Sequence, residues 1–158
     1  MGIENDDQEM SRTLREATRR RADLHHALLQ VEHTTSRAGA GRLEDWSRDV
    51  IKPLTMLLDT IEEHIKGTES QGGLYEEIIA RAPHLSNQIG RLREEHPTLR
   101  DGAAELIERL QTTRIGDAWP LDEARDDIQR LLGKVVRHRQ RGADLIWEAY
   151  NLDIGGFD

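Results

Sequence analysis

Four long segments of the chain carry an aliphatic residue at every third or fourth position, and this spacing constrains the fold most strongly. Such a repeat places the aliphatic residues on one face of an α-helix. The segments cover about residues 7–37, 42–69, 84–113 and 121–150. Helices with one apolar face bury those faces against one another. The sequence therefore predicts an all-α fold, an antiparallel up-down-up-down four-helix bundle.

The residues expected in the core follow four stripes, one on each segment. They are Leu14, Ala17, Leu24, Leu28 and Val31, then Val50, Leu54, Leu57 and Ile61, then Leu85, Ile89, Leu92, Leu99, Ala103, Leu106 and Leu110, and finally Leu121, Ala124, Ile128, Leu131, Val135, Leu145 and Ala149. Pro53 lies inside the second segment and is expected to kink the helix or to mark its true beginning. The stretch "GGLYEEIIARAP" predicts a short connecting helix.

Length and composition favour one domain, predicted to span residues 1–158 with its core at about 8–152. The chain has 158 residues, enough for one hydrophobic core. It contains 1 Phe, so aliphatic residues must form that core, which is typical of helical proteins. No segment approaches the ~20 apolar residues of a membrane-spanning helix, and no signal peptide is recognisable. A cytoplasmic location without membrane association is expected.

The charge of the chain disfavours nucleic acid as a partner. Acidic residues number 30 and basic residues 22, which gives a net charge of −8. The run "REATRRRADLHH" distributes its arginines around a helix, which favours a solvated face over a binding patch. The chain has no cysteine, which excludes disulfides, iron–sulfur clusters and thiolate metal sites. The sequence identifies no protein partner.

Three histidines occupy stripe positions on three different segments. The second stripe continues to His64, the third includes His96 and the fourth includes His138. A buried polar group without a partner costs on the order of 1–3 kcal/mol. Imidazoles that converge can share a metal ion, since neutral imidazole suits Zn, Cu, Fe or Ni. A buried hydrogen-bonded network with water is the competing solution.

The first segment offers a less clear candidate. His25 flanks its stripe, whereas His26, His33 and His84 are expected to face solvent. His25 reaches the level of His64 only if the segment before Pro53 overhangs or bends away.

The chain resembles the hemerythrin-like (HHE cation-binding) domains in four stretches that together cover most of residues 24–156. These are "LHHALLQVEH", "HIKGTESQGGLYEEI", "RAPHLSNQIGRLREEHPTL" and "HRQRGADLIWEAYNLDIGG". The resemblance implies an antiparallel helical bundle with a non-haem di-iron centre. Members of that family bind dioxygen or take part in responses to oxygen, nitric oxide or iron.

The resemblance implies five metal ligands, which are His25, His64, Glu69, His96 and His138. The family pattern has seven, and this chain departs from it on three helices. Thr68 stands where the second helix should carry Glu, Leu92 where the third should carry its first His, and Ala143 where the fourth should carry Asp. Glu69, one position further, reaches inward only if Gly67 lets the helix distort. The site is expected to hold two metal ions with solvent bridges, one ion or none; zinc is an alternative to iron.

Two functions remain open at this point. The first is a metal-binding protein with a histidine-rich iron site that binds or senses oxygen or a related small ligand. No residue stands out as a general acid or base, so enzymatic turnover is not expected. The second is a metal-free interaction or sensor module whose core loosens when its histidines become charged. Tyr75 and Trp147 are candidates to shield a metal pocket.

Overall fold

The structure is a computed structural model that describes residues 11–39 and 41–151. This part of the chain is helical and contains no β-strand. Its elements are α1 (Arg12–Thr35), α2 (Leu43–Glu69), α3 (Leu74–Arg81), the short 3-10 helix η1 (Pro83–Leu85), α4 (Ser86–Thr112) and α5 (Leu121–Tyr150). Residues 7–10 of the first expected helix, and both ends of the expected core, lie outside the described residues.

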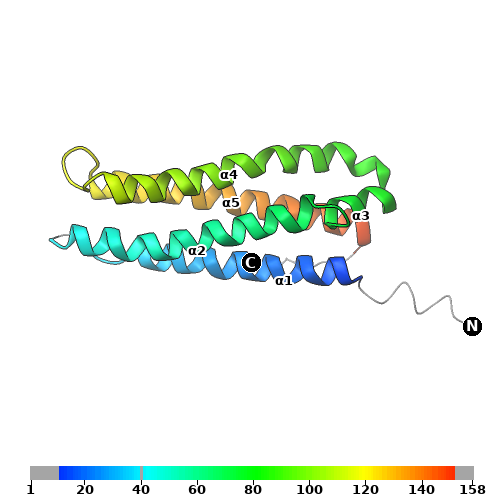
Figure 1. The fold of residues 1–158 in the computed structure, drawn as a ribbon, viewed down its shortest axis with the longest axis horizontal. Coiled ribbons are helices and arrows are strands. Elements are labelled where there is room, and N and C mark those ends of the chain that lie inside the picture. The colour runs from blue at the N-terminus through cyan, green and yellow to red at the C-terminus, as the bar shows by residue number, and fades with distance from the viewer. Residues whose placement is uncertain (1–10, 40, 152–158) are drawn as a thin grey trace, which may run out of the picture.

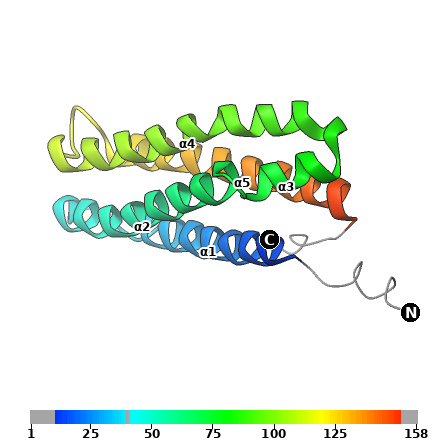
Figure 2. The same ribbon diagram turned by 45° about the vertical axis from the view of Figure 1, so that its right-hand side comes forward.

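The four long helices lie side by side and alternate in direction along the bundle (Figure 1). Helix α1 packs against α2 and α5, and α4 packs against the same two helices, so the four form a closed ring. Helix α3 covers one end of this ring, where it contacts α1, α2 and α5; Figure 2 shows it beside the end of α5. The predicted antiparallel four-helix bundle is confirmed.

Local sequence signals account for several of the helix ends. The Ser11 hydroxyl accepts a hydrogen bond of 3.1 Å from the backbone N–H of Leu14 and so caps α1. Asn151 ends α5 in the left-handed region, with φ of 59°. Helix α2 begins at Leu43 and continues through Pro53, so Pro53 does not mark its beginning.

A layer of polar side chains divides the apolar core into two clusters. The larger cluster contains Leu24, Ala27, Leu28, Val31, Trp46, Val50, Leu54, Leu57, Ile61, Leu99, Ala103, Leu110, Ile115, Trp119, Ala124, Ile128, Leu131, Leu132 and Val135. The smaller contains Leu14, Ala17, Leu74, Tyr75, Ile78, Ala82, Leu85, Ile89, Leu92, Leu145 and Ile146. What we call the polar layer consists of Arg20, Arg21, His64, Thr68, His96, His138 and Arg139. On α1, α4 and α5 these residues fall between the two clusters along the helix, whereas His64 and Thr68 follow Ile61, the last buried residue that α2 contributes to the larger cluster.

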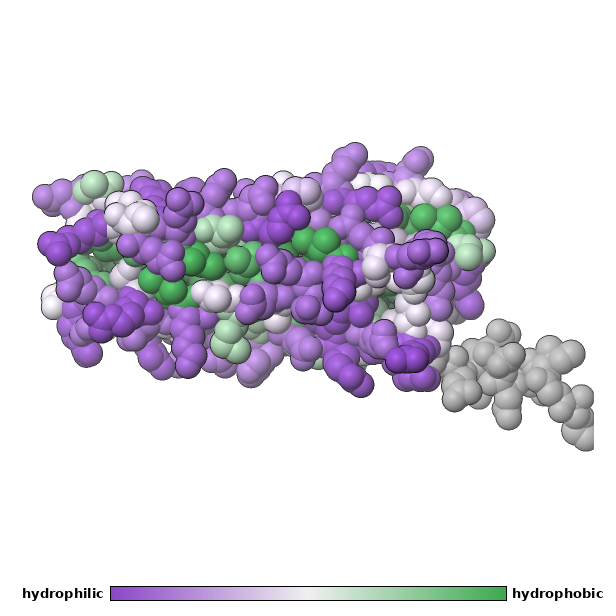
Figure 3. Space-filling view, viewed as in Figure 1, coloured by the Kyte–Doolittle hydropathy of each residue, from purple (hydrophilic) through white to green (hydrophobic). Residues whose placement is uncertain are grey.

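The face of the molecule seen in Figure 3 is largely hydrophilic, with a broken line of hydrophobic side chains along its middle. Trp147 is 51% exposed and therefore does not shield an internal pocket, contrary to the expectation from sequence. Within residues 11–39 and 41–151, no helix combines the length and the apolar character that crossing a membrane requires.

Replacement of Leu57 by alanine should lower the free energy of unfolding by about 2–5 kcal/mol, because Leu57 is fully buried in the larger cluster. The neighbouring Met56 is 50% exposed, so Met56→Ala should change it by less than about 0.5 kcal/mol. Urea denaturation of both variants measures the difference. Equal losses in the two variants would contradict the assignment of the core.

Candidate metal centre

Three imidazoles from three helices converge in the polar layer. One ring nitrogen from each of His64, His96 and His138 lies within 4.8 Å of the other two. The ring centroids are 4.9–5.2 Å apart. His96 and His138 are 1% and 2% exposed, and His64 is partly buried. The prediction that these three histidines lie on the apolar faces of their helices is therefore confirmed.

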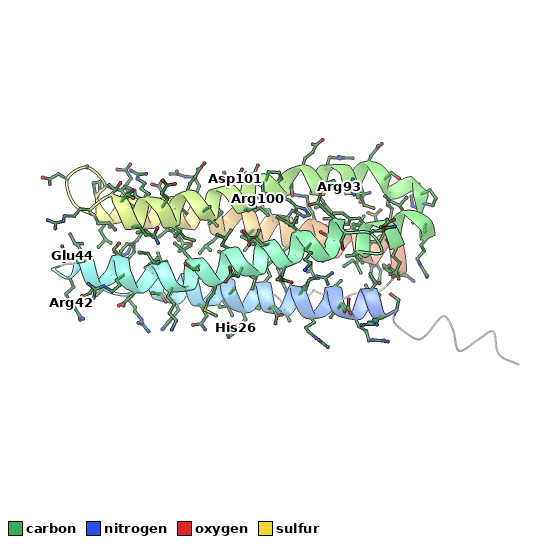
Figure 4. All side chains as sticks on the ribbon, in the orientation of Figure 1. His26, Arg42, Glu44, Arg93, Arg100 and Asp101 are labelled. Carbon is green, nitrogen blue, oxygen red and sulfur yellow. The ribbon has the colours of Figure 1, made fainter. Side chains whose placement is uncertain are left out.

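A carboxylate holds the outer nitrogen of two of these rings. His96 Nδ1 lies 2.9 Å from Glu69 Oε2, and His138 Nδ1 lies 2.8 Å from Glu95 Oε1. Each carboxylate is in turn held by an arginine. Arg93, on α4 (Figure 4), contacts Glu69 at 3.3 Å, and Arg141 donates to both oxygens of Glu95.

These carboxylates fix which nitrogen carries the hydrogen. An ionised carboxylate only accepts hydrogen bonds, so Nδ1 must be the donor in both His96 and His138. Their Nε2 atoms then present lone pairs to the centre of the bundle. His96 Nε2 lies 3.2 Å from the Tyr75 hydroxyl, and His138 Nε2 lies 3.1 Å from His64 Nε2. Histidine ligands of metals are commonly oriented by a carboxylate on the opposite nitrogen in this way.

The surroundings keep all three rings neutral near pH 7. Burial lowers the pKa of His138 to about 4, although Glu95 acts in the opposite direction. Burial also lowers the pKa of His96, and it lowers that of His64 together with the nearby His138 and His96. Burial raises the pKa of Glu95, but hydrogen bonds from His138 and Arg141 outweigh it and leave a net lowering. Neutral imidazole is the form that binds metal ions.

The structure does not bring His25 into this group. His25 is half-buried on α1, and the cluster found among the described residues contains only the other three histidines. Because α2 runs without interruption from Leu43, His64 lies level with Ala17 and Arg21 of α1, which line the same cavity. His25 is therefore nearer the first turn than the site. His26 and His84 are exposed as expected, and His26 points away from the bundle (Figure 4).

Glu69 lies beside the site but outside the three-nitrogen group. Helix α2 stays regular through Glu69, so Gly67 does not turn this carboxylate toward His64. Glu69 instead faces α4 and binds His96 and Arg93. Thr68, at the position of the family's missing glutamate, is buried and donates to the backbone carbonyl of His64 at 2.8 Å.

Several residues of the site were not singled out as site residues by the sequence. Glu95 and Arg141 support His138, and Arg20 and Arg21 supply the α1 side of the layer. Arg21 continues the stripe of Leu14, Ala17 and Leu24, so the spacing that revealed the histidines also points to it. Tyr75, a candidate pocket residue, is 3% exposed and contacts His96.

A small cavity of about 20 Å³ adjoins the imidazoles. It is lined by Ala17, Arg20, Arg21, His64, Thr68, Leu74, Tyr75, His138, Gly142, Leu145 and Ile146. A volume of this size accommodates one particle about as large as water. The site thus has space for one small ligand next to two of the three imidazoles.

The described donors fit one metal ion better than two. Two nitrogens bound to one ion at about 2.0–2.1 Å lie roughly 3–4 Å apart. The 3.1 Å between His64 Nε2 and His138 Nε2 meets this, whereas the spread of the three nitrogens over up to 4.8 Å requires the rings to move closer around an ion. A pair of ions would need bridging carboxylates, but Glu69 and Glu95 are bonded to histidine and arginine instead. The residues present therefore do not fit the seven-ligand di-iron centre.

Comparison with protein-family models, with curated proteins and with solved structures found no match to this chain.

The metal-free protein should become less stable as the pH falls from 7 to 5. Unfolded histidine has a pKa of about 6.5, whereas that of folded His138 is about 4. Between these values the unfolded chain binds more protons, so stability is present above pH 7 and is lost on acidification. His138 alone accounts for about 2 kcal/mol at pH 5.

Urea titrations in the presence of a chelator, at pH 7 and at pH 5, measure this loss. The exposed His84 is the matched control, so His84→Gln should retain the full pH dependence and His138→Gln should lose much of it. A wild-type protein equally stable at both pH values would contradict the assignment of neutral buried rings.

Proposed function

We propose that the protein is a hemerythrin-like metal-binding protein in which His64, His96 and His138 hold one transition-metal ion inside the bundle. The observation that carries this proposal is the convergence of three ring nitrogens within 4.8 Å, with two rings oriented by carboxylates. We propose non-haem iron as the metal, following the resemblance to hemerythrin-like domains. Imidazole ligands alone also suit zinc and copper.

When bound, iron would supply a redox-active centre for dioxygen or a related small ligand. The chain itself supplies the surroundings of that centre. Glu69 and Glu95 orient two rings, and the apolar clusters on both sides of the layer exclude water. Tyr75 and Thr68 line the adjoining cavity and limit the size of what can enter. We assign no acid or base role to any residue.

Metal analysis of protein produced with added iron or zinc tests the proposal. The wild type should contain about one ion per chain, and alanine at His64, His96 or His138 should abolish binding. Glu95→Ala should weaken binding by about 10- to 100-fold, because it removes the acceptor that orients His138. Protein loaded with iron should show a visible absorption band.

The control variants are His84→Ala and His25→Ala. His84 is exposed and remote from the cluster, so its loss should leave metal content unchanged. His25→Ala distinguishes the ligand set seen in the structure from the one that the family pattern implies. The structure predicts full metal content for this variant, and the family pattern predicts a loss. A wild type that takes up no metal under any of these conditions would refute the proposal.

A second candidate function is a metal-free interaction or sensor module. The hydrogen bonds of the layer favour it, because both nitrogens of His96 and of His138 have partners within the protein. The layer can thus be satisfied without an ion. In this function the rings serve to fix the packing of three helices, and their protonation is the signal.

The two functions differ in whether added metal stabilises the wild type but not the His96→Leu variant. In the presence of a chelator, the free energy of unfolding of this variant should equal that of the wild type or exceed it by about 1 kcal/mol, since leucine continues the aliphatic stripe. Added metal should stabilise the wild type and leave the variant unchanged if the rings are ligands. If metal stabilises neither protein, the metal-free function is supported. Denaturant titrations with and without metal measure both effects.

A further inference from the structure

The Arg20 side chain reaches from α1 into the polar layer, where two of its nitrogens lack hydrogen-bond partners. Its Nε and Nη2 atoms are buried and bond to none of the described residues. Glu16 and Glu63 attract the guanidinium from exposed positions, but neither is bonded to it, and Glu16 is paired with Arg12 at 3.1 Å. Arg20 as a whole is only partly buried, but two buried donors without a bonded partner are costly, so a partner from outside the chain is expected at these two atoms.

Gly67 makes this position of Arg20 possible. A Cβ atom at residue 67 would lie 2.2 Å from Arg20 Cζ and 2.4 Å from its Nε. The guanidinium therefore rests directly on the backbone of α2, where any larger residue would displace it. The glycine at position 67 and the unbonded nitrogens of Arg20 therefore occur at the same place in the structure.

The unbonded guanidinium adjoins the small cavity. Arg20 lines this space of about 20 Å³ together with His64 and His138, and the hydroxyl-bearing residues Thr68 and Tyr75 complete its polar wall. One particle of about the size of water fits there. A ligand in the cavity therefore meets a guanidinium and the imidazole pair.

The charges around the cavity favour an anion as that ligand. Glu69 and Glu95 are already paired with Arg93 and Arg141. A second arginine, Arg21, also lines the cavity and donates to the carbonyl oxygen of Arg139 at 2.8 Å. The charged side chains that line the cavity are therefore both arginines.

We propose that the cavity binds one small monovalent anion, of the size of chloride, between the Arg20 guanidinium and the His64–His138 pair. Binding to Arg20 requires no metal. A bound metal cation would add to the positive charge at the cavity. We therefore infer that the same anion is the ligand of the metal-loaded site, and only this part of the inference rests on the proposed function.

Chloride titration of the metal-free protein, kept in a chelator, tests the proposal. Broadening of the ³⁵Cl nuclear magnetic resonance line reports binding directly, and thermal unfolding in potassium chloride against potassium gluconate at equal ionic strength reports its effect on stability. The wild type should show saturable broadening and a higher Tm in chloride. Arg20→Met should bind at least about tenfold more weakly, because it removes the charged donors.

The neighbouring exposed Arg19 provides the matched control, so Arg19→Met should behave as the wild type. Gly67→Ala should weaken chloride binding by displacing Arg20, and it tests the site if Arg20→Met does not fold. Equal behaviour in chloride and gluconate would show that the cavity holds water only and would overturn the proposal, as would wild-type affinity in Arg20→Met. The metal content of the wild type is a separate readout, since a wild type that binds chloride but no metal refutes the proposed metal alone.

Discussion

The hydrogen bond from a histidine Nδ1 to a carboxylate, made twice in the middle of the bundle, is the interaction on which the rest of the structure depends. It allows His96 and His138 to be almost completely buried without an unsatisfied donor. It also joins helices, because Glu69 of α2 holds a ring of α4 and Glu95 of α4 holds a ring of α5. The rotation of three helices about their axes is thereby fixed at one level.

The polar layer at that level divides the apolar core into its two clusters. On α1, α4 and α5 the aliphatic stripe is interrupted at this level and resumes beyond it, whereas α2 ends just past the layer and α3 supplies the apolar residues beyond. Helix α1 takes part with arginines rather than histidine, and Arg21 and Arg139 each donate to the other's backbone carbonyl across α1 and α5. Hydrogen bonds of different kinds thus join α1 to α5, α5 to α4 and α4 to α2 at this level.

The spacing of apolar residues was sufficient to predict the four helices and the inward positions of His64, His96 and His138, because both depend only on helical geometry. The same rule leads to Arg21 on the first helix, whereas the family pattern led to His25. Glu69 and Glu95 lie off the stripes, and only the packing of α4 and α5 shows which ring each reaches. Arg20 and Gly67 likewise meet only through the contact of α1 with α2, which no local pattern reveals.

The carboxylates that hold the rings are themselves at the surface. The side chains of Glu69 and Glu95 are each 28% exposed, while the side chains of His96 and His138 are 2% exposed. Each imidazole is therefore the inner end of a short relay that leads through one carboxylate to bulk water. A change in the acidity of the solvent therefore meets each of these two buried rings across a single glutamate side chain.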